Sequence, residues 1–216
     1  IAEDAAAFFF PPGTNWTTLT EVRLKDNNDQ SAGNIDVVLV SYDDRGHIQD
    51  FGALEIQAVY ISGNVRNPFE YYMQNPLLHK DMDWTSNANY PRADYLSSSR
   101  KRLAPQLIFK GGIFKTWNKK TAVALNSGFF ETLPQLDEVP KGTADIAWLV
   151  YDLVYSQGSG SYVLTKTRTV YTAFHDSLNK ITRSEAGPVQ QFLQQLQNKL
   201  SDKLARPDTE TIDAAF

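Results

Sequence analysis

The clearest hydrophobic pattern in the chain lies between residues 34 and 64. Residues 35–42 form an apolar run that contains Asp36, which is typical of a strand covered on both faces. The turn-forming group Asp43-Asp44-Arg45-Gly46 follows. Residues 51–61 then alternate, with one face made of Leu54, Ile56, Ala58 and Tyr60 and the other containing Glu55 and Gln57. The segment therefore predicts two antiparallel strands joined by a tight reversal.

A reversal centred near Arg45 and Gly46 places Asp36 directly opposite Glu55, with Cβ atoms about 4.5–5.5 Å apart. Two carboxylates that face each other among aliphatic side chains repel and are costly to desolvate. A divalent cation removes that cost, because hard cations prefer oxygen ligands. The pattern leaves two interpretations open: a metal site, or a structural pair neutralised by Arg23 or another cation. Glu21 could add a third acid, although a salt bridge with Arg23 or a lysine is the preferred interpretation.

The remaining pattern predicts an α/β fold, a mixed sheet flanked by helices. Residues 3–10 predict a short helix or strand, and residues 62–95 show no clean period, which is typical of a functional or disordered segment. Pro105 and the pair Gly111-Gly112 are expected to kink or end the helical stretch 97–117. Strands are expected at residues 17–25 and 121–125, a hairpin at 144–155 and 161–174, and an amphipathic helix at 188–204.

Composition sets limits on the class of protein. A chain of 216 residues with 42% apolar content predicts one domain, residues 1–216, in which residues 188–216 form a C-terminal helix and a loose tail. The sequence contains no cysteine, which excludes disulfides and thiolate metal sites. It begins Ile-Ala-Glu-Asp and shows no signal peptide or membrane span, so an intracellular protein is expected.

Charge is distributed unevenly along the chain. The net charge of −4 argues mildly against a nucleic-acid binder. Residues 95–130, however, contain seven basic residues and no acidic one. Such a stretch predicts either a strip that faces phosphates or a solvated basic helix face. Its members are Arg100, Lys101, Arg102, Lys110, Lys115, Lys119 and Lys120.

A family resemblance appears at the paired acids. Asp36, followed on the next strand by Glu55-Ile56-Gln57, resembles the PD-(D/E)xK nuclease motif with Gln in place of the usual Lys. The surrounding sequence resembles the NotI family of type II restriction endonucleases from about residue 21 to residue 153. The resemblance is carried by the segments EVRLKDNNDQSAGNIDVVLVSYDD, FGALEIQAVYISGN and RLAPQLIFKGGIFKTWNKK.

The resemblance implies a restriction-endonuclease-like core and a homodimeric, Mg²⁺-dependent enzyme of the prokaryotic cytoplasm. Such an enzyme cuts both strands of a long, GC-rich palindromic DNA site. Asp36, Glu55 and the backbone carbonyl of Ile56 would hold Mg²⁺, and Asp36, Glu55 and Gln57 would be catalytic. Gln57 can only orient its neighbours by hydrogen bonds, because it carries no charge. The family also has a four-cysteine iron region upstream, which is not expected here because the chain has no cysteine.

Side-chain chemistry suggests which residues contact DNA. Arginine reads guanine bidentately and asparagine reads adenine, and basic residues bind phosphates. The candidates are Asn64, Arg66, Arg92, Arg100, Lys101, Arg102 and Lys110. Two alternatives remain open: a DNA-binding relative that does not cleave, and a retaining glycoside hydrolase that uses Asp36 and Glu55 without a metal.

Overall fold

The computed structural model describes residues 1–205 of the chain, which divide into two units. The first unit, residues 1–182, contains the sheet and most of the helices. The second begins at Arg183, and its described part contains the helix α9 (Val189–Ala205). The predicted C-terminal helix is therefore confirmed, whereas the predicted tail at 206–216 lies outside the described residues. None of the helices described is long and apolar enough to cross a membrane.

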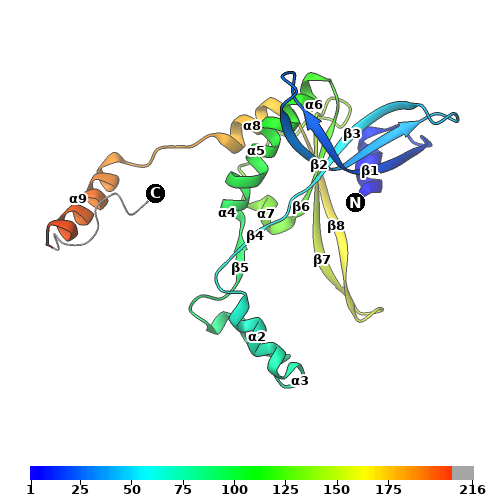
Figure 1. Cartoon of the computed structure of the whole chain (residues 1–216). Coiled ribbons are helices and arrows are strands. Elements are labelled where there is room, and N and C mark those ends of the chain that lie inside the picture. The colour runs from blue at the N-terminus through cyan, green and yellow to red at the C-terminus, as the bar shows by residue number, and fades with distance from the viewer. Residues whose placement is uncertain (206–216) are drawn as a thin grey trace. The chain divides into compact units, whose positions relative to one another are not determined.

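The first unit is built on a mixed six-stranded sheet, as predicted (Figure 1). The order is β1-β2-β3-β6-β7-β8, in which β3, β6 and β7 run parallel and the other neighbours are antiparallel. The strands are β1 (Trp16–Lys25), β2 (Ser31–Tyr42), β3 (Ile48–Ile56), β6 (Thr121–Asn126), β7 (Ile146–Ser156) and β8 (Ser161–Thr172). The short strands β4 (Tyr60–Ser62) and β5 (Arg92–Asp94) form a separate antiparallel pair.

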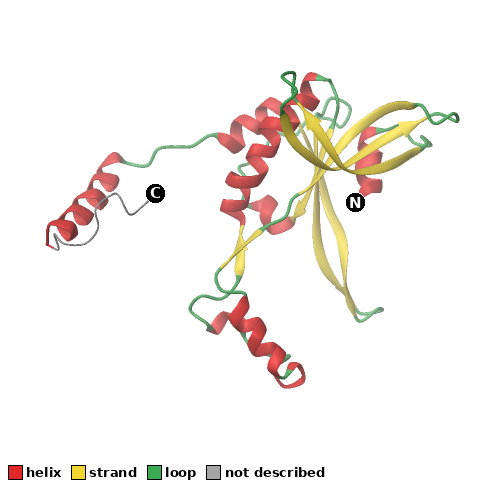
Figure 2. Ribbon diagram, in the orientation of Figure 1, coloured by secondary structure: helices red, strands yellow, loops and turns green. Residues whose placement is uncertain are grey.

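Helices cover both faces of the sheet (Figure 2). On one face α1 (Ala2–Phe9) buries Phe8 and Phe9 in a cluster with Leu54. On the other face the helical connection between β5 and β6 packs with α7 (Ser127–Glu131) and α8 (Phe174–Thr182) in a cluster centred on Trp148, which is fully buried. Since side chains alternate along each strand, the sheet carries two separate apolar layers.

The helical connection runs without interruption from Tyr95 to Thr116, so the prediction that it ends at Pro105 or at the glycine pair is wrong, whereas the alternative of a kink stays a prediction. It consists of α4 (Tyr95–Ser98), η2 (Ser99–Leu103), α5 (Ala104–Gln106), η3 (Leu107–Gly111) and α6 (Gly112–Thr116). The segments η2 and η3 are wide π-type turns, in which Ala104 N–H donates to Ser99 O and Gly112 N–H to Leu107 O. Pro105 follows the wide turn of η2, and such a turn accommodates a proline that cannot donate to the preceding turn.

The segment from 62 to 95 contains short regular elements, which the absence of a hydrophobic period had not predicted. They are α2 (Arg66–Gln74), α3 (Pro76–His79), η1 (Trp84–Ser86) and β5. Two of the helical pieces begin at side-chain caps, because Asn75 accepts from Leu78 N–H and Asp83 accepts from Thr85 N–H. Side-chain caps, rather than apolar spacing, therefore mark where these short helices begin.

Candidate active site

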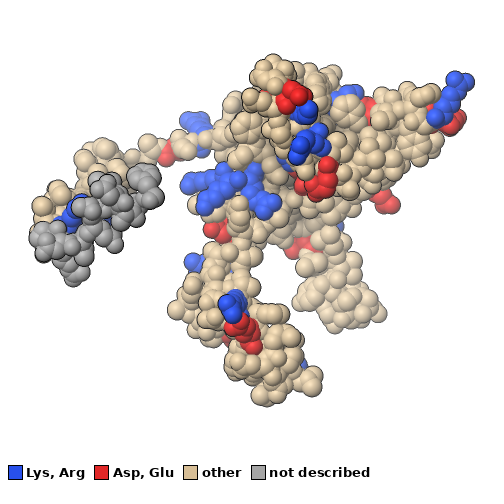
Figure 3. Space-filling model, in the orientation of Figure 1, with Lys and Arg blue, Asp and Glu red and all other residues tan. Residues whose placement is uncertain are grey.

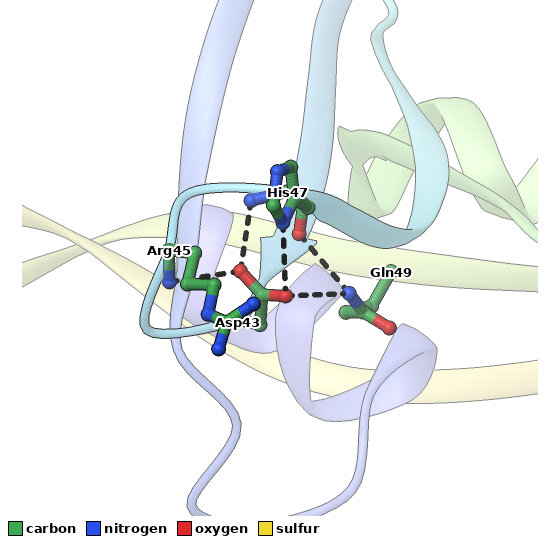
Figure 4. Close-up of polar contacts among 4 residues, drawn as sticks. All are labelled: Asp43, Arg45, His47 and Gln49. Atoms are coloured by element: carbon green, nitrogen blue, oxygen red, sulfur yellow. Dashed lines mark hydrogen bonds and ion pairs between the residues drawn. The ribbon is translucent and has the colours of Figure 1, made fainter.

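Asp43 closes the hairpin turn that joins β2 to β3 (Figure 4). Asp43 Oδ1 accepts hydrogen bonds from Arg45 N–H and His47 N–H, both at 2.9 Å, and Oδ2 lies 3.3 Å from Gln49 Nε2. The backbone hydrogen bond from His47 is the largest of the contacts that lower the pKa of Asp43. The register shifts by one residue just beyond the turn, because Tyr42 pairs with Ile48 but Ser41 pairs with Asp50.

The predicted facing of Asp36 and Glu55 agrees with the observed strand pairing. Val37 lies opposite Leu54 and Val38 opposite Ala53, and Asp36 and Glu55 are the next residues beyond the last of these pairs. Asp36 Oδ2 accepts a hydrogen bond from Ile56 N–H at 2.8 Å. This contact ties the Asp36 carboxylate to the strand that carries Glu55, so the hairpin brings the two acids to the same end of β3.

Glu55 is buried and its partner is a lysine from the helical connection. Its side chain is only 6% exposed, and Lys110 Nζ donates to Glu55 Oε2 at 2.7 Å. Gln106 Nε2 lies 3.4 Å from the same oxygen. The structural interpretation named Arg23 or another cation; Arg23 lies exposed on β1, and Lys110 is the other cation. Lys110 is therefore the basic side chain that contacts the acidic pair.

Burial makes the Glu55 carboxyl a weaker acid than an exposed glutamate. It raises the pKa of the Glu55 carboxyl from 4.5 to about 7, the Lys110 ammonium opposes this rise, and the Asp36 carboxylate adds to it. The influence of Asp36 on this pKa is consistent with the proximity given by the strand register. A carboxyl of this kind exchanges its proton near neutral pH.

Three buried oxygen atoms at this site have no hydrogen-bond partner within the described part of the chain: Glu55 Oε1, Gln57 Oε1 and Gln106 Oε1. Gln57 is itself buried and uses its amide nitrogen to donate to Ala58 O at 2.8 Å. A cavity of about 10 Å³, enough for one water molecule, is lined by Glu55, Gln106 and Lys110 among others. Unpaired buried acceptors are costly, and they call for a donor or a cation.

The strand that carries these groups ends earlier than predicted. The pattern gave one strand over 51–61, but β3 stops at Ile56 and Tyr60 pairs with Asp94 in the second sheet. Ile56 and Tyr60 are exposed, whereas Glu55 and Gln57 are buried. The polar face of the alternation therefore points into the protein at this end of the strand.

Glu21 occupies neither of its expected positions. It adopts a left-handed backbone conformation, with φ 53°, and its carboxylate accepts from Asn34 Nδ2 at 3.2 Å. Among residues 1–205 no group of three or more His, Cys, Asp or Glu side chains is placed to hold a metal ion. A third acidic ligand is thus not supported.

The basic stretch divides into exposed and internal residues. Arg100 and Lys101 are exposed on η2, and Arg102 lies over the Tyr60 ring at 5.5 Å; Lys and Arg side chains gather over this part of the molecule (Figure 3). Lys110 is 8% exposed, so its expected place on a DNA-facing strip is wrong. Three further members are engaged within the protein: Lys115 with Asp145, Lys119 with Asp50, and Lys120 with the carbonyl of Phe8.

The other DNA-binding candidates lie on the elements around the second sheet. Asn64 Oδ1 accepts from Asn67 N–H at 3.0 Å, which is a turn contact at the start of α2. Arg66 pairs with Glu70 at 2.6 Å. Arg92 is exposed and lies 5.8 Å from the centre of the Tyr90 ring. Among the residues described, none of these three side chains contacts Asp36 or Glu55.

Lys110 and Gln106 are the site residues whose role the sequence interpretation missed. The sequence does contain a signal for the burial of Lys110. This residue continues the helical spacing of Leu103, Leu107 and Phe114, all of which are buried. Residues three and four apart share one face of a helix. A lysine on the apolar stripe of a helix therefore predicts a buried partner.

Comparison with known families identifies the class of protein. A family model of restriction endonucleases matches residues 1–164, which include Asp36, Glu55, Gln57 and Lys110. The protein is therefore an enzyme that cleaves DNA, a site-specific endonuclease. The description of that model is Restriction endonuclease NotI, and the chain belongs to this family. The predicted family is confirmed, and the match favours the nuclease over the glycoside hydrolase. A search of curated proteins found no match.

Proposed function

We propose that this enzyme hydrolyses phosphodiester bonds in both strands of a long, GC-rich palindromic DNA site, with Mg²⁺ at the acidic pair. The observation that carries the proposal is the buried Glu55 carboxylate beside Asp36, with Glu55 Oε1 lacking a partner among the residues described. A buried, partly unsatisfied carboxylate next to a second one suits a hard cation. The PD-(D/E)xK assignment of this core belongs to the same proposal.

The residues present fit a magnesium ion. Asp36, Glu55 and the backbone carbonyl of Ile56 would hold it, and Mg²⁺ typically uses one or two carboxylates together with waters and substrate phosphates. Two carboxylates, without a third acid, are therefore enough protein ligands for Mg²⁺ at this site. When bound, Mg²⁺ polarises the scissile phosphate and lowers the pKa of water.

The chain's own side chains prepare this site. Asp36 is oriented by Ile56 N–H, and Glu55 is held through Oε2 by Lys110 and Gln106. Gln57 turns its amide nitrogen to Ala58 O, and its Oε1 stays available as an acceptor. Gln57 can therefore orient a donor such as water, but it cannot contribute charge.

The surface offers groups for binding DNA. Arg100 and Lys101 are exposed and suited to phosphates. Arg66 and Arg92 are the candidates for reading guanine, since arginine binds O6 and N7 bidentately. A palindromic target has two-fold symmetry, so we expect two copies of the chain to act as a dimer. We expect the enzyme to work in the cytoplasm of a prokaryotic cell.

The test is digestion of a plasmid library with Mg²⁺, followed by sequencing of the new ends. One recurring palindrome at the ends is the expected result, and a chelator should abolish cleavage. Asp36→Ala and Glu55→Ala should lower cleavage of that site by more than about 100-fold, beyond the loss typical of an outer-shell partner. Both variants should retain duplex binding within a few-fold.

Asp44→Ala, at an exposed residue of the hairpin turn, is the matched control and should cleave like the wild type. Binding of duplex without cleavage in the wild type would identify a catalytically silent relative. Cleavage that persists in Asp36→Ala or Glu55→Ala would contradict the proposed mechanism.

A further inference from the structure

Lys110 is unlike the other basic residues of the chain. Among residues 1–205 it is the only lysine or arginine that is buried. A buried ammonium is expensive unless it is paired, and its pairing with a carboxylate rarely offsets the full cost of desolvation. An apolar side chain at this position would continue the stripe formed by Leu103, Leu107 and Phe114. The Lys110 ammonium therefore lies on a helix face where packing alone favours an apolar side chain.

The stem of Lys110 passes close to β2 on its way to the acidic pair. Its Cε lies 3.5 Å from the place that a Cβ on Gly33 would occupy, so the bare backbone of β2 at this point borders the lysine stem. Its Nζ then reaches Glu55 Oε2, and Gln106 approaches the same oxygen from the preceding turn. Both groups come from the helical connection and contact one oxygen of the carboxylate. The other oxygen, Oε1, is left without a partner in the described structure.

Lys110 offsets one of the two negative charges at this end of β3. Asp36 and Glu55 are two acids, and Gln57, the next inward-facing residue of the segment, is neutral. Cleavage of a phosphodiester adds negative charge to the phosphate in the transition state, and fixed positive charge stabilises it. Lys110 is the cation that the structure holds against this site.

We propose that Lys110 is a positioning residue of the active site: it holds Glu55 through Oε2 and supplies the positive charge that Gln57 cannot. The inference rests on the proposed nuclease function and assigns Lys110 to the catalytic step rather than to DNA binding. If the role of Lys110 is to place a positive charge at the site, a lysine at position 57 should be able to supply that charge instead.

The test compares four proteins on the cleavage site found by end sequencing: the wild type, Lys110→Met, Lys141→Met and Lys110→Met/Gln57→Lys. Lys110→Met should lower kcat by about 100-fold or more, the loss typical of one preorganised electrostatic group. KM and duplex affinity without metal should change by less than about three-fold, because phosphate contacts are made by surface residues. Mg²⁺ should still raise the Tm of this variant, since ligand binding stabilises the folded state. Lys141→Met removes an exposed charge from the loop before β7, away from the acidic pair and the DNA-binding candidates, and should leave kcat unchanged.

The double variant gives the deciding result. Moving the ammonium to position 57 should recover at least about ten-fold of the lost kcat, which a purely structural role of Lys110 would not allow. Wild-type kcat in Lys110→Met, or parallel loss of kcat, DNA binding and the Mg²⁺ effect on Tm, would overturn the inference. If Lys110→Met does not fold, a folded double variant without activity overturns it, and an active one supports it. A wild type that does not cleave refutes the proposed function itself.

Discussion

The weak acidity of Glu55 makes a quantitative prediction about stability and pH. Replacing Glu55 by Gln keeps the shape and removes the titrating group, while Lys110 stays in both proteins. The free energy of unfolding of the wild type should therefore change with pH relative to Glu55→Gln, and the change should follow the pKa of this one carboxyl.

The pKa is raised from 4.5 to about 7 in the folded protein, mainly by burial. A raised carboxyl pKa means that the folded state binds the proton more tightly than the unfolded state. The resulting stability is fully present below pH 4.5 and is lost as the pH rises through about 7. At about 1.4 kcal/mol per pKa unit, the total change is roughly 3 kcal/mol.

Urea unfolding of both proteins between pH 4 and pH 8.5, followed by circular dichroism, measures this difference. Glu55→Gln should gain about 3 kcal/mol on the wild type across that range, with most of the gain between pH 5 and pH 7. Glu131→Gln, at an exposed residue of α7, is the control and should show a flat difference. A flat difference for Glu55→Gln as well would mean that Glu55 is not desolvated, and the argument from burial would fail.

Two further predictions concern the core and the DNA-binding surface. Thr172 Oγ1 accepts from Trp148 Nε1 at 2.9 Å and from Ser177 Oγ at 2.7 Å, so Thr172→Val should cost about 1–3 kcal/mol in urea unfolding; a loss below about 0.5 kcal/mol would contradict this. Arg100→Ala should lower the slope of log affinity against log salt by about one phosphate contact in anisotropy titrations, and an unchanged slope would place Arg100 away from DNA.

The hairpin could be predicted because its signals are local. The Asp43 turn, the apolar run and the alternation after it all act within about 25 residues, and they agree with one another. They placed Asp36 near Glu55, although they did not predict the register shift between Ser41 and Tyr42. The end of β3 could not be predicted in this way, because Ile56 and Tyr60 look like core residues in the pattern and are exposed in the structure.

The role of Lys110 was not predicted because its partner is distant in sequence. Glu55 and Lys110 are 55 residues apart, and neither the hydrophobic period nor the charge pattern links them. The basic residues around Lys110 suggested a surface strip, since a cluster of like charges is usually solvated. Lys110 shares a helix face with Leu107 and Phe114, which indicates burial, but that spacing does not identify Glu55 as its partner.

The topology explains why a helix supplies the counter-charge. Since β3 and β6 are parallel neighbours, the chain between them must return along a face of the sheet, and helices form most of such crossovers. The inward stripe of that crossover then covers the strand that carries Glu55. The β2–β3 hairpin thus positions Asp36 and Glu55, and the helical crossover positions Lys110. The two parts of the site meet at the Glu55 carboxylate. A mutation that shifts the crossover, such as Gly111→Val against the Phe174 ring, should therefore impair cleavage while leaving the hairpin intact.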